Sequence, residues 1–201
     1  MFRKWIKIHF LNFYSRPARN KNLIFKSIDF YFIICYIIDT EEGNLPNQKE
    51  IPMKIMFDMD GTIANLYGVE NWLEMLHNYD ETPYKNAEVM LNMSLLARYL
   101  NMVQKMGFEI GIISWLSKNG NMEYNEKVTL AKIEWLNKHL ASVNFDYIHI
   151  VSYGTPKSFY TENCEDILFD DEEHNREEWT GIAYAPDKII EVLKELAREG
   201  I

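Results

Sequence analysis

Two aspartates one residue apart stand at the end of a short apolar segment. Asp58 and Asp60 follow residues 54–57, and Gly61 and Thr62 come next. An apolar run that stops abruptly at acidic residues is typical of a buried strand whose carboxyl end opens onto a ligand site in an α/β sheet. Carboxylates in such a place can hold a divalent cation, attack an electrophilic atom or transfer a proton.

This segment also admits two simpler structures. Asp-x-Asp-Gly can form a turn, because an Asp side chain bonds its own backbone and Gly allows a positive φ. A calcium loop would need, counted from Asp58, an acid at its fifth position and glycine at its sixth. Those positions hold Thr62 and Ile63, which excludes the calcium loop. The turn remains open on this segment alone.

Polar residues also close three later apolar segments, each of which is predicted to be a strand. The segments are residues 108–114, 147–151 and 166–169. Because the carboxyl ends of parallel strands share one edge of the sheet, we expect these polar groups to meet Asp58 and Asp60. They are Ser114, Lys157, Asp170 and Asp171.

Amphipathic helical patterns separate the predicted strands. The alternation predicts an α/β fold, a Rossmann-like three-layer α/β/α sandwich whose parallel sheet is covered on both faces. Residues 63–84, with a short amphipathic stretch around Trp72, are expected to form a small helical cap insert after the first strand. The predicted helices cover residues 82–106 (with a break near Asn92), 126–140 and 186–198, and a fifth short strand covers 181–184.

Several carboxylates at one edge repel one another, and Mg²⁺ relieves this repulsion when it binds one or two carboxylates, water and a substrate phosphate. Lys157 and the Ser114 hydroxyl supply a positive charge and a hydrogen bond for phosphate oxygens. One carboxylate can then attack phosphorus to form an aspartyl-phosphate. The other can protonate the leaving alcohol and later activate water.

The ordered set resembles the four motifs of the haloacid dehalogenase-like hydrolases, over about residues 53–197. The resemblance implies that Asp58 is the nucleophile, and that Asp60 is the acid/base with its backbone carbonyl on Mg²⁺. It further implies a metal site made by Asp58, Asp60, Asp170 and Asp171, and phosphate contacts from Gly61, Thr62, Ser114 and Lys157.

A narrower resemblance is to the 5'(3')-deoxyribonucleotidase branch of these hydrolases. It is carried by residues 132–140, 146–150, Lys157-Ser158 and 167–171, in that order. It implies a nucleotide substrate. Separately from this resemblance, Tyr67, Trp72, Tyr79 and Trp115 could stack on a base or belong to the core, and Trp115 is the favoured base contact. Thr62 and Glu172 depart from the pattern of that branch.

Purely structural roles remain open for some of these residues. Ser114 could cap a turn, and the acidic pair with the two glutamates after it could form a solvated turn. The phosphate-binding role predicted for Lys157 could also belong to Lys118, Lys127 or Lys132.

Composition narrows the class of protein. The chain has 201 residues, 47% of them hydrophobic and 25% charged, as in an ordinary globular domain. With two cysteines and no secretory pattern, we expect a reduced, cytoplasmic protein. Residues 51–201 hold thirteen Lys/Arg against twenty-five Asp/Glu. Such an acidic body is a poor partner for duplex nucleic acid and suits a small phosphorylated substrate held through a cation.

Residues 1–52 differ from the rest, with eight Lys/Arg against five Asp/Glu in the first fifty residues. Their uncharged apolar run, residues 30–38, is nine residues long, whereas a membrane span needs about 20. We therefore expect no stable membrane span. Three hypotheses are an interfacial anchor, a disordered extension, and translated sequence upstream of a true start at Met53; the last is favoured because the organised pattern begins there. We expect residues 53–201 to form the domain that resembles the hydrolases.

The favoured function is a Mg²⁺-dependent phosphomonoesterase acting on a nucleotide or another small phosphorylated metabolite. A phosphatase of nucleic-acid ends and a non-catalytic binding module of the same fold are the alternatives. Response regulators also use acids and a lysine on a parallel sheet, but their paired acids follow the first strand and their phosphorylated Asp comes later, the reverse of the order here.

Overall fold

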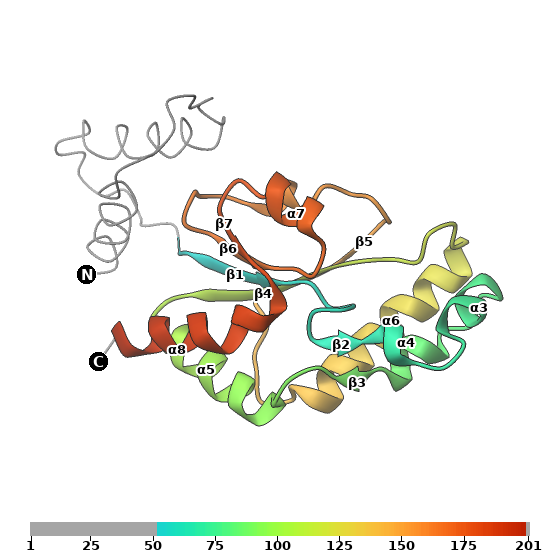
Figure 1. Cartoon of the computed structure of the whole chain (residues 1–201), viewed down its shortest axis with the longest axis horizontal. Helices are drawn as coiled ribbons and strands as arrows, with labels where there is room; N and C mark the ends of the chain where they lie inside the picture. Colours follow the sequence, from blue (N-terminus) through green and yellow to red (C-terminus); the bar gives the residue numbers. More distant parts are fainter. Residues whose placement is uncertain (1–51, 200–201) are drawn as a thin grey trace, which may run out of the picture. The chain divides into compact units, whose positions relative to one another are not determined.

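The computed structural model describes residues 52–199, and Figure 1 shows their arrangement. The three hypotheses for the N-terminal segment concern residues 1–52, of which residues 1–51 lie outside the described part. Five strands form a parallel sheet in the order β5-β4-β1-β6-β7. Their bounds are β1 Lys54–Phe57, β4 Glu109–Trp115, β5 Tyr147–Val151, β6 Ile167–Phe169 and β7 Ile182–Tyr184.

The order of the strands places β1 at a reversal of the chain path. From β1 the chain proceeds to β4 and β5 on one side, and it then crosses to β6 and β7 on the other side. In open α/β sheets, ligands bind outside the carboxyl ends of the strands at such a reversal. Asp58 is the first residue after β1 and therefore lies at this position.

Helices flank the sheet, which confirms the predicted α/β fold. In Figure 1, α5 (Met93–Lys105), α6 (Met122–His139) and α8 (Ile189–Glu199) lie on one side of the sheet and α7 (Glu173–Glu178) lies on the other. All residues of β1 and β6 are buried, as expected for strands covered on both faces. No helix within residues 52–199 is long and apolar enough to cross a membrane.

Several helix boundaries differ from the sequence prediction; the last helix, α8, begins at Ile189, because Pro186–Lys188 form the separate 3-10 helix η3. The break predicted near Asn92 within residues 82–106 is confirmed: it separates α4 (Thr82–Asn86) from α5, and the short strand β3 (Glu88–Val89), which was not predicted, lies between them. The Asn92 side chain caps α5 by accepting a hydrogen bond from the Leu95 amide. Helix α6 begins at Met122, four residues before the predicted start, because Asn121 caps it in the same way through the Tyr124 amide.

The insert after the first strand begins and ends in a small antiparallel ribbon, in which β2 (Ala64–Asn65) pairs with β3. Between them lie η1 (Leu66–Gly68), α3 (Trp72–His77) and α4. Helix α4 packs on α6, where the Trp135 indole N–H donates to the Ala87 carbonyl at 2.7 Å. Helix α3, by contrast, has no fully buried residue.

Candidate active site

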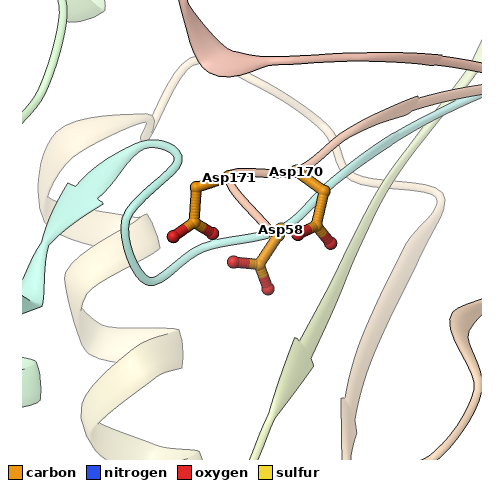
Figure 2. Close-up of side chains that lie close together, drawn as sticks. All are labelled: Asp58, Asp170 and Asp171. Atoms are coloured by element: carbon orange, nitrogen blue, oxygen red, sulfur yellow. The ribbon is translucent and has the colours of Figure 1, made fainter. Parts of the chain in front are cut away.

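Three carboxylates meet where β1 and β6 end side by side. Asp58 follows β1, and Asp170 and Asp171 follow β6 (Figure 2). The Asp58 amide donates to the Phe169 carbonyl at 2.8 Å, which continues the ladder between the two strands. Oxygens of the three carboxylates lie within 4.8 Å of one another. Segments far apart in sequence thus deliver three acids to one place.

Lys157, the first residue of η2 (Lys157–Tyr160), lies between two of these acids. Its ammonium donates to Asp58 Oδ1 at 2.7 Å and to Asp170 Oδ2 at 2.6 Å. An ammonium has three N–H donors, so these two acceptors leave one N–H for a ligand. Lys157 also lines the adjoining cavity, where that N–H would be used.

Burial and neighbouring charges shift the pKa values of three residues in this cluster, Asp170, Asp171 and Lys157. Burial raises the pKa of Asp171 to about 7, and the neighbouring Asp58 and Asp170 add to the rise. Burial and the Asp58 charge also raise the pKa of Asp170. Burial acts to lower the pKa of Lys157, but the facing Asp58 and Asp170 carboxylates outweigh it and raise that pKa.

The donor set fits a divalent cation. Three carboxylates face a single ammonium, so the cluster carries excess negative charge when the acids are ionised. Hard cations such as Mg²⁺ and Ca²⁺ prefer oxygen ligands, and a cation here would relieve the repulsion between the three carboxylates. Asp58, Asp170 and Asp171 are therefore the candidate ligands.

The loop after β1 supports Asp171. Thr62 Oγ1 accepts a hydrogen bond from the Asp171 amide at 3.1 Å, and Gly61 has a φ of +82°. A Cβ atom on Gly61 would overlap the Asp171 carboxylate and the Tyr67 ring. Glycine is required here both by the backbone conformation and by the close approach of the acidic turn. Gly61 and Thr62, predicted as phosphate contacts, are placed against Asp171 and do not line the cavity.

Helix α7 fixes the turn that carries the acidic pair. Asn175 Nδ2 donates to both carboxylate oxygens of Asp170 at 3.2 Å. The Arg176 guanidinium donates to the carbonyl oxygens of Asp170 and Asp171 at 2.8 and 2.6 Å. Neither Asn175 nor Arg176 was predicted from the sequence. Their position one helical turn after the acidic pair is the signal that could have found them.

Asp60 has a different partner, Lys132 of α6. The Lys132 ammonium donates to Asp60 Oδ2 at 2.5 Å, to Ser114 Oγ at 2.7 Å and to the Trp115 carbonyl at 2.8 Å. Burial raises the pKa of Asp60, and the Lys132 charge opposes the rise. Ser114, predicted as a phosphate contact, is fully buried beside Lys132 and does not line the cavity. Lys132, one of the predicted rivals of Lys157, therefore has a separate set of acceptors.

A cavity of about 300 Å³ opens above the carboxylates. Trp115 lines it and is fixed by an indole N–H donated to the Thr155 carbonyl at 2.9 Å. The Tyr153 ring lies 5.1 Å from that of Trp115. The lining includes Asp58, Asp60, Asp170, Asp171, Glu172 and Lys157, together with the apolar and aromatic residues Leu66, Tyr67, Trp72, Leu73, Leu76, Tyr84, Trp115, Leu116 and Tyr153.

The chain was compared with known proteins. No family model matches it, and no curated protein matches it. Among solved structures, it is similar to the D,D-heptose 1,7-bisphosphate phosphatase from Burkholderia thailandensis, with a TM-score of 0.40 and 13% identity. That alignment covers 62% of this chain and 70% of the phosphatase chain. A similarity at this level carries no information about the activity of the chain, which has to be inferred from the site.

Proposed function

We propose that the protein is a Mg²⁺-dependent phosphomonoesterase of the haloacid dehalogenase-like type. One observation carries the proposal: the Asp58 carboxylate, the Lys157 ammonium and the Asp170-Asp171 pair meet at the reversal point of a parallel sheet, beside a cavity. Phosphoryl transfer needs mainly alignment and neutralisation of charge, and this set can supply both. Mg²⁺ held by Asp58, Asp170, Asp171 and the Asp60 carbonyl would neutralise phosphate charge.

The residues suggest a two-step reaction. In the first step, an Asp58 oxygen attacks phosphorus while the bond to the leaving oxygen breaks, and Asp60 gives its proton to that oxygen. In the second step, Asp60 takes a proton from water, the water oxygen attacks phosphorus, and the bond to Asp58 breaks. Inorganic phosphate is released and both aspartates return to their starting states. The remaining N–H of Lys157 would hold a phosphate oxygen in both steps.

The proposed substrate is a small phosphorylated metabolite, in particular a nucleotide. The cavity volume of about 300 Å³ lies at the small end of ligand sites. Trp115 and Tyr153 present aromatic surface beside the acids, which suits a planar base. The acidic charge of residues 51–201 disfavours nucleic-acid ends as the substrate. A cytoplasmic location, expected from the sequence, is part of the same proposal.

The test is an assay of inorganic phosphate release from a panel of phosphorylated metabolites with and without Mg²⁺. We expect wild-type activity that requires the cation and is highest on nucleoside monophosphates. Asp58→Asn should lower kcat by at least about 10³-fold, because no nucleophile remains, while circular dichroism stays unchanged. Asp187→Asn, at an exposed position, is the matched control.

Two outcomes would contradict parts of this proposal. Activity of Asp58→Asn above a trace would refute the nucleophile. A wild-type protein that binds phosphate esters but releases no phosphate from any of them would favour the non-catalytic binding module.

A further inference from the structure

A second lysine, Lys132, donates all of its ammonium hydrogen bonds to groups inside the protein. Its side chain is 0% exposed, and its three N–H donors match three acceptors: Asp60 Oδ2, Ser114 Oγ and the Trp115 carbonyl. No N–H remains for a phosphate, in contrast to Lys157. A buried charge is costly unless it is paired and hydrogen-bonded, so this arrangement strongly specifies where each partner lies.

Tyr84 of the insert covers the same ammonium. The Lys132 Nζ atom lies 4.9 Å from the centre of the Tyr84 ring, and Tyr84 is 3% exposed. An aromatic face attracts a cation and excludes water from it. Helix α4, which carries Tyr84, is bound to α6 through the Trp135 bond and through the Tyr124 hydroxyl, which donates to the Asp80 carbonyl at 3.1 Å. The insert thus contributes a wall around the partner of Asp60.

We propose that Lys132 is a positioning residue, which holds the Asp60 carboxyl group in place to protonate the leaving-group oxygen, and that the Tyr84 ring keeps this contact free of water. The inference rests on the proposed phosphomonoesterase function and assigns a role to residues that this function does not otherwise use. Asp60 lies on a turn after β1, and Lys132 ties its carboxylate to the end of β4 through Ser114 and Trp115. Without Lys132, the carboxylate can rotate away from the leaving group.

A requirement for a positioned acid depends on the leaving group. An alkoxide leaves poorly unless it is protonated, whereas p-nitrophenolate leaves without a proton. A positioned general acid contributes about 10²- to 10⁴-fold. For Lys132→Met we therefore expect kcat on an alkyl phosphate to fall by at least about 10²-fold, and kcat on p-nitrophenyl phosphate to fall by less than about 10-fold. A merely structural role would lower both equally.

Three variants complete the test. Tyr84→Leu should show the same selective loss, smaller in size, because it removes the ring that covers the Lys132 ammonium. Lys127→Met is the matched control, since Lys127 lies exposed on the same helix and pairs with Glu123 at 2.8 Å. In an Asp60→Asn background, Lys132→Met should cause no further loss on the alkyl phosphate, because the two residues act as one unit.

Equal losses on both substrates, or an additional loss in the Asp60→Asn background, would overturn the inference and leave the proposed function intact. If Lys132→Met does not fold, Lys132→Arg and Tyr84→Leu provide the same comparison between substrates. Arg keeps the charge but changes the geometry of the donors, so a selective loss on the alkyl phosphate is again expected. A wild-type protein inactive on both phosphates would refute the proposed function itself.

Discussion

Single residues explain why the acids lie so close together. Gly61 lets the loop after β1 approach Asp171, and Lys157 shares its ammonium between Asp58 and Asp170. At position 61, a Cβ atom would overlap the Asp171 carboxylate. The contribution of Gly61 can be measured separately, because the chain contains a second glycine with a similar backbone conformation and no close neighbours.

Gly61→Ala and Gly107→Ala form a matched pair. Both glycines have positive φ, +82° and +97°, but a Cβ on Gly107 would meet nothing within 4 Å. Backbone strain should lower the free energy of unfolding by about 1 kcal/mol in either variant. Only Gly61→Ala should also displace Asp171, and we expect it to lower phosphatase kcat by at least about 10-fold. Denaturant unfolding and phosphate release measure the two effects. Equal activity in the two variants would contradict the role given to the contact with Asp171.

Most of the acids could be predicted from sequence, because each ends an apolar strand. The partner of Asp60 could not be assigned in this way, since Lys132 lies inside a helix. A signal does exist: Val128, Ala131, Lys132, Trp135 and Leu136 are all buried positions of α6. A lysine in an otherwise apolar stripe of a helix indicates a buried ion pair. The hydrogen bond between Lys132 and Ser114 could not be predicted either, because the sequence shows where the strand that carries Ser114 ends but not which helix residue lies beside it.

At the level of elements, the insert has two unlike halves. Helix α4 is anchored on α6 and carries Tyr84, whereas α3 has no fully buried residue and places Trp72, Leu73 and Leu76 at the cavity. The anchored half therefore belongs to the body of the domain. The sequence predicted the amphipathic stretch of α3 but not the ribbon of β2 and β3, because strands of two residues are too short to show a periodic pattern.

Trp135→Phe tests the anchor between α4 and α6. The variant keeps most of the buried ring but removes the N–H that donates to the Ala87 carbonyl, leaving that buried carbonyl without its partner. The free energy of unfolding should fall by about 1–3 kcal/mol, as measured by urea unfolding. Trp72→Phe, in the half-buried helix α3, is the control and should change stability by less than about 1 kcal/mol. A larger loss of stability in Trp72→Phe than in Trp135→Phe would contradict the conclusion that α4, and not α3, is the anchored half of the insert.

At the scale of the whole molecule, the strand order determines where the site lies. The central strand β1 has β4 on one side and β6 on the other, so the ends of three strands deliver the acids, Ser114 and Trp115 to one edge. The parallel α/β architecture followed from the alternation of apolar strands with amphipathic helices. The exact starts of α5 and α6 did not, because they depend on the caps formed by Asn92 and Asn121.

The concentration of acids at this edge links stability to pH and to the cation. The pKa of Asp171 is raised from 3.8 to about 7, and the pKa of Asp170 is raised in the same direction. Between these values the folded protein binds more protons than the unfolded chain, so stability should fall as pH rises from about 4 to about 7 when no divalent cation is present. Mg²⁺ binds the ionised carboxylates, and its stabilising effect should therefore be greater at about pH 8 than at about pH 5.

Thermal unfolding with excess Mg²⁺ and with a chelator, at both pH values, measures this linkage. We expect Mg²⁺ to raise Tm by several degrees at the higher pH, corresponding to about 1–3 kcal/mol, and by much less at the lower pH. Asp171→Asn should remove most of the difference, because Asn cannot ionise, while the exposed Asp187→Asn should retain it. An equal Mg²⁺ effect at both pH values, or an unchanged difference in Asp171→Asn, would show that these carboxylates do not form the cation site. In that case, phosphate binding would have to be measured separately from catalysis, because Asp58 and Lys157 could still form a phosphate site without a metal.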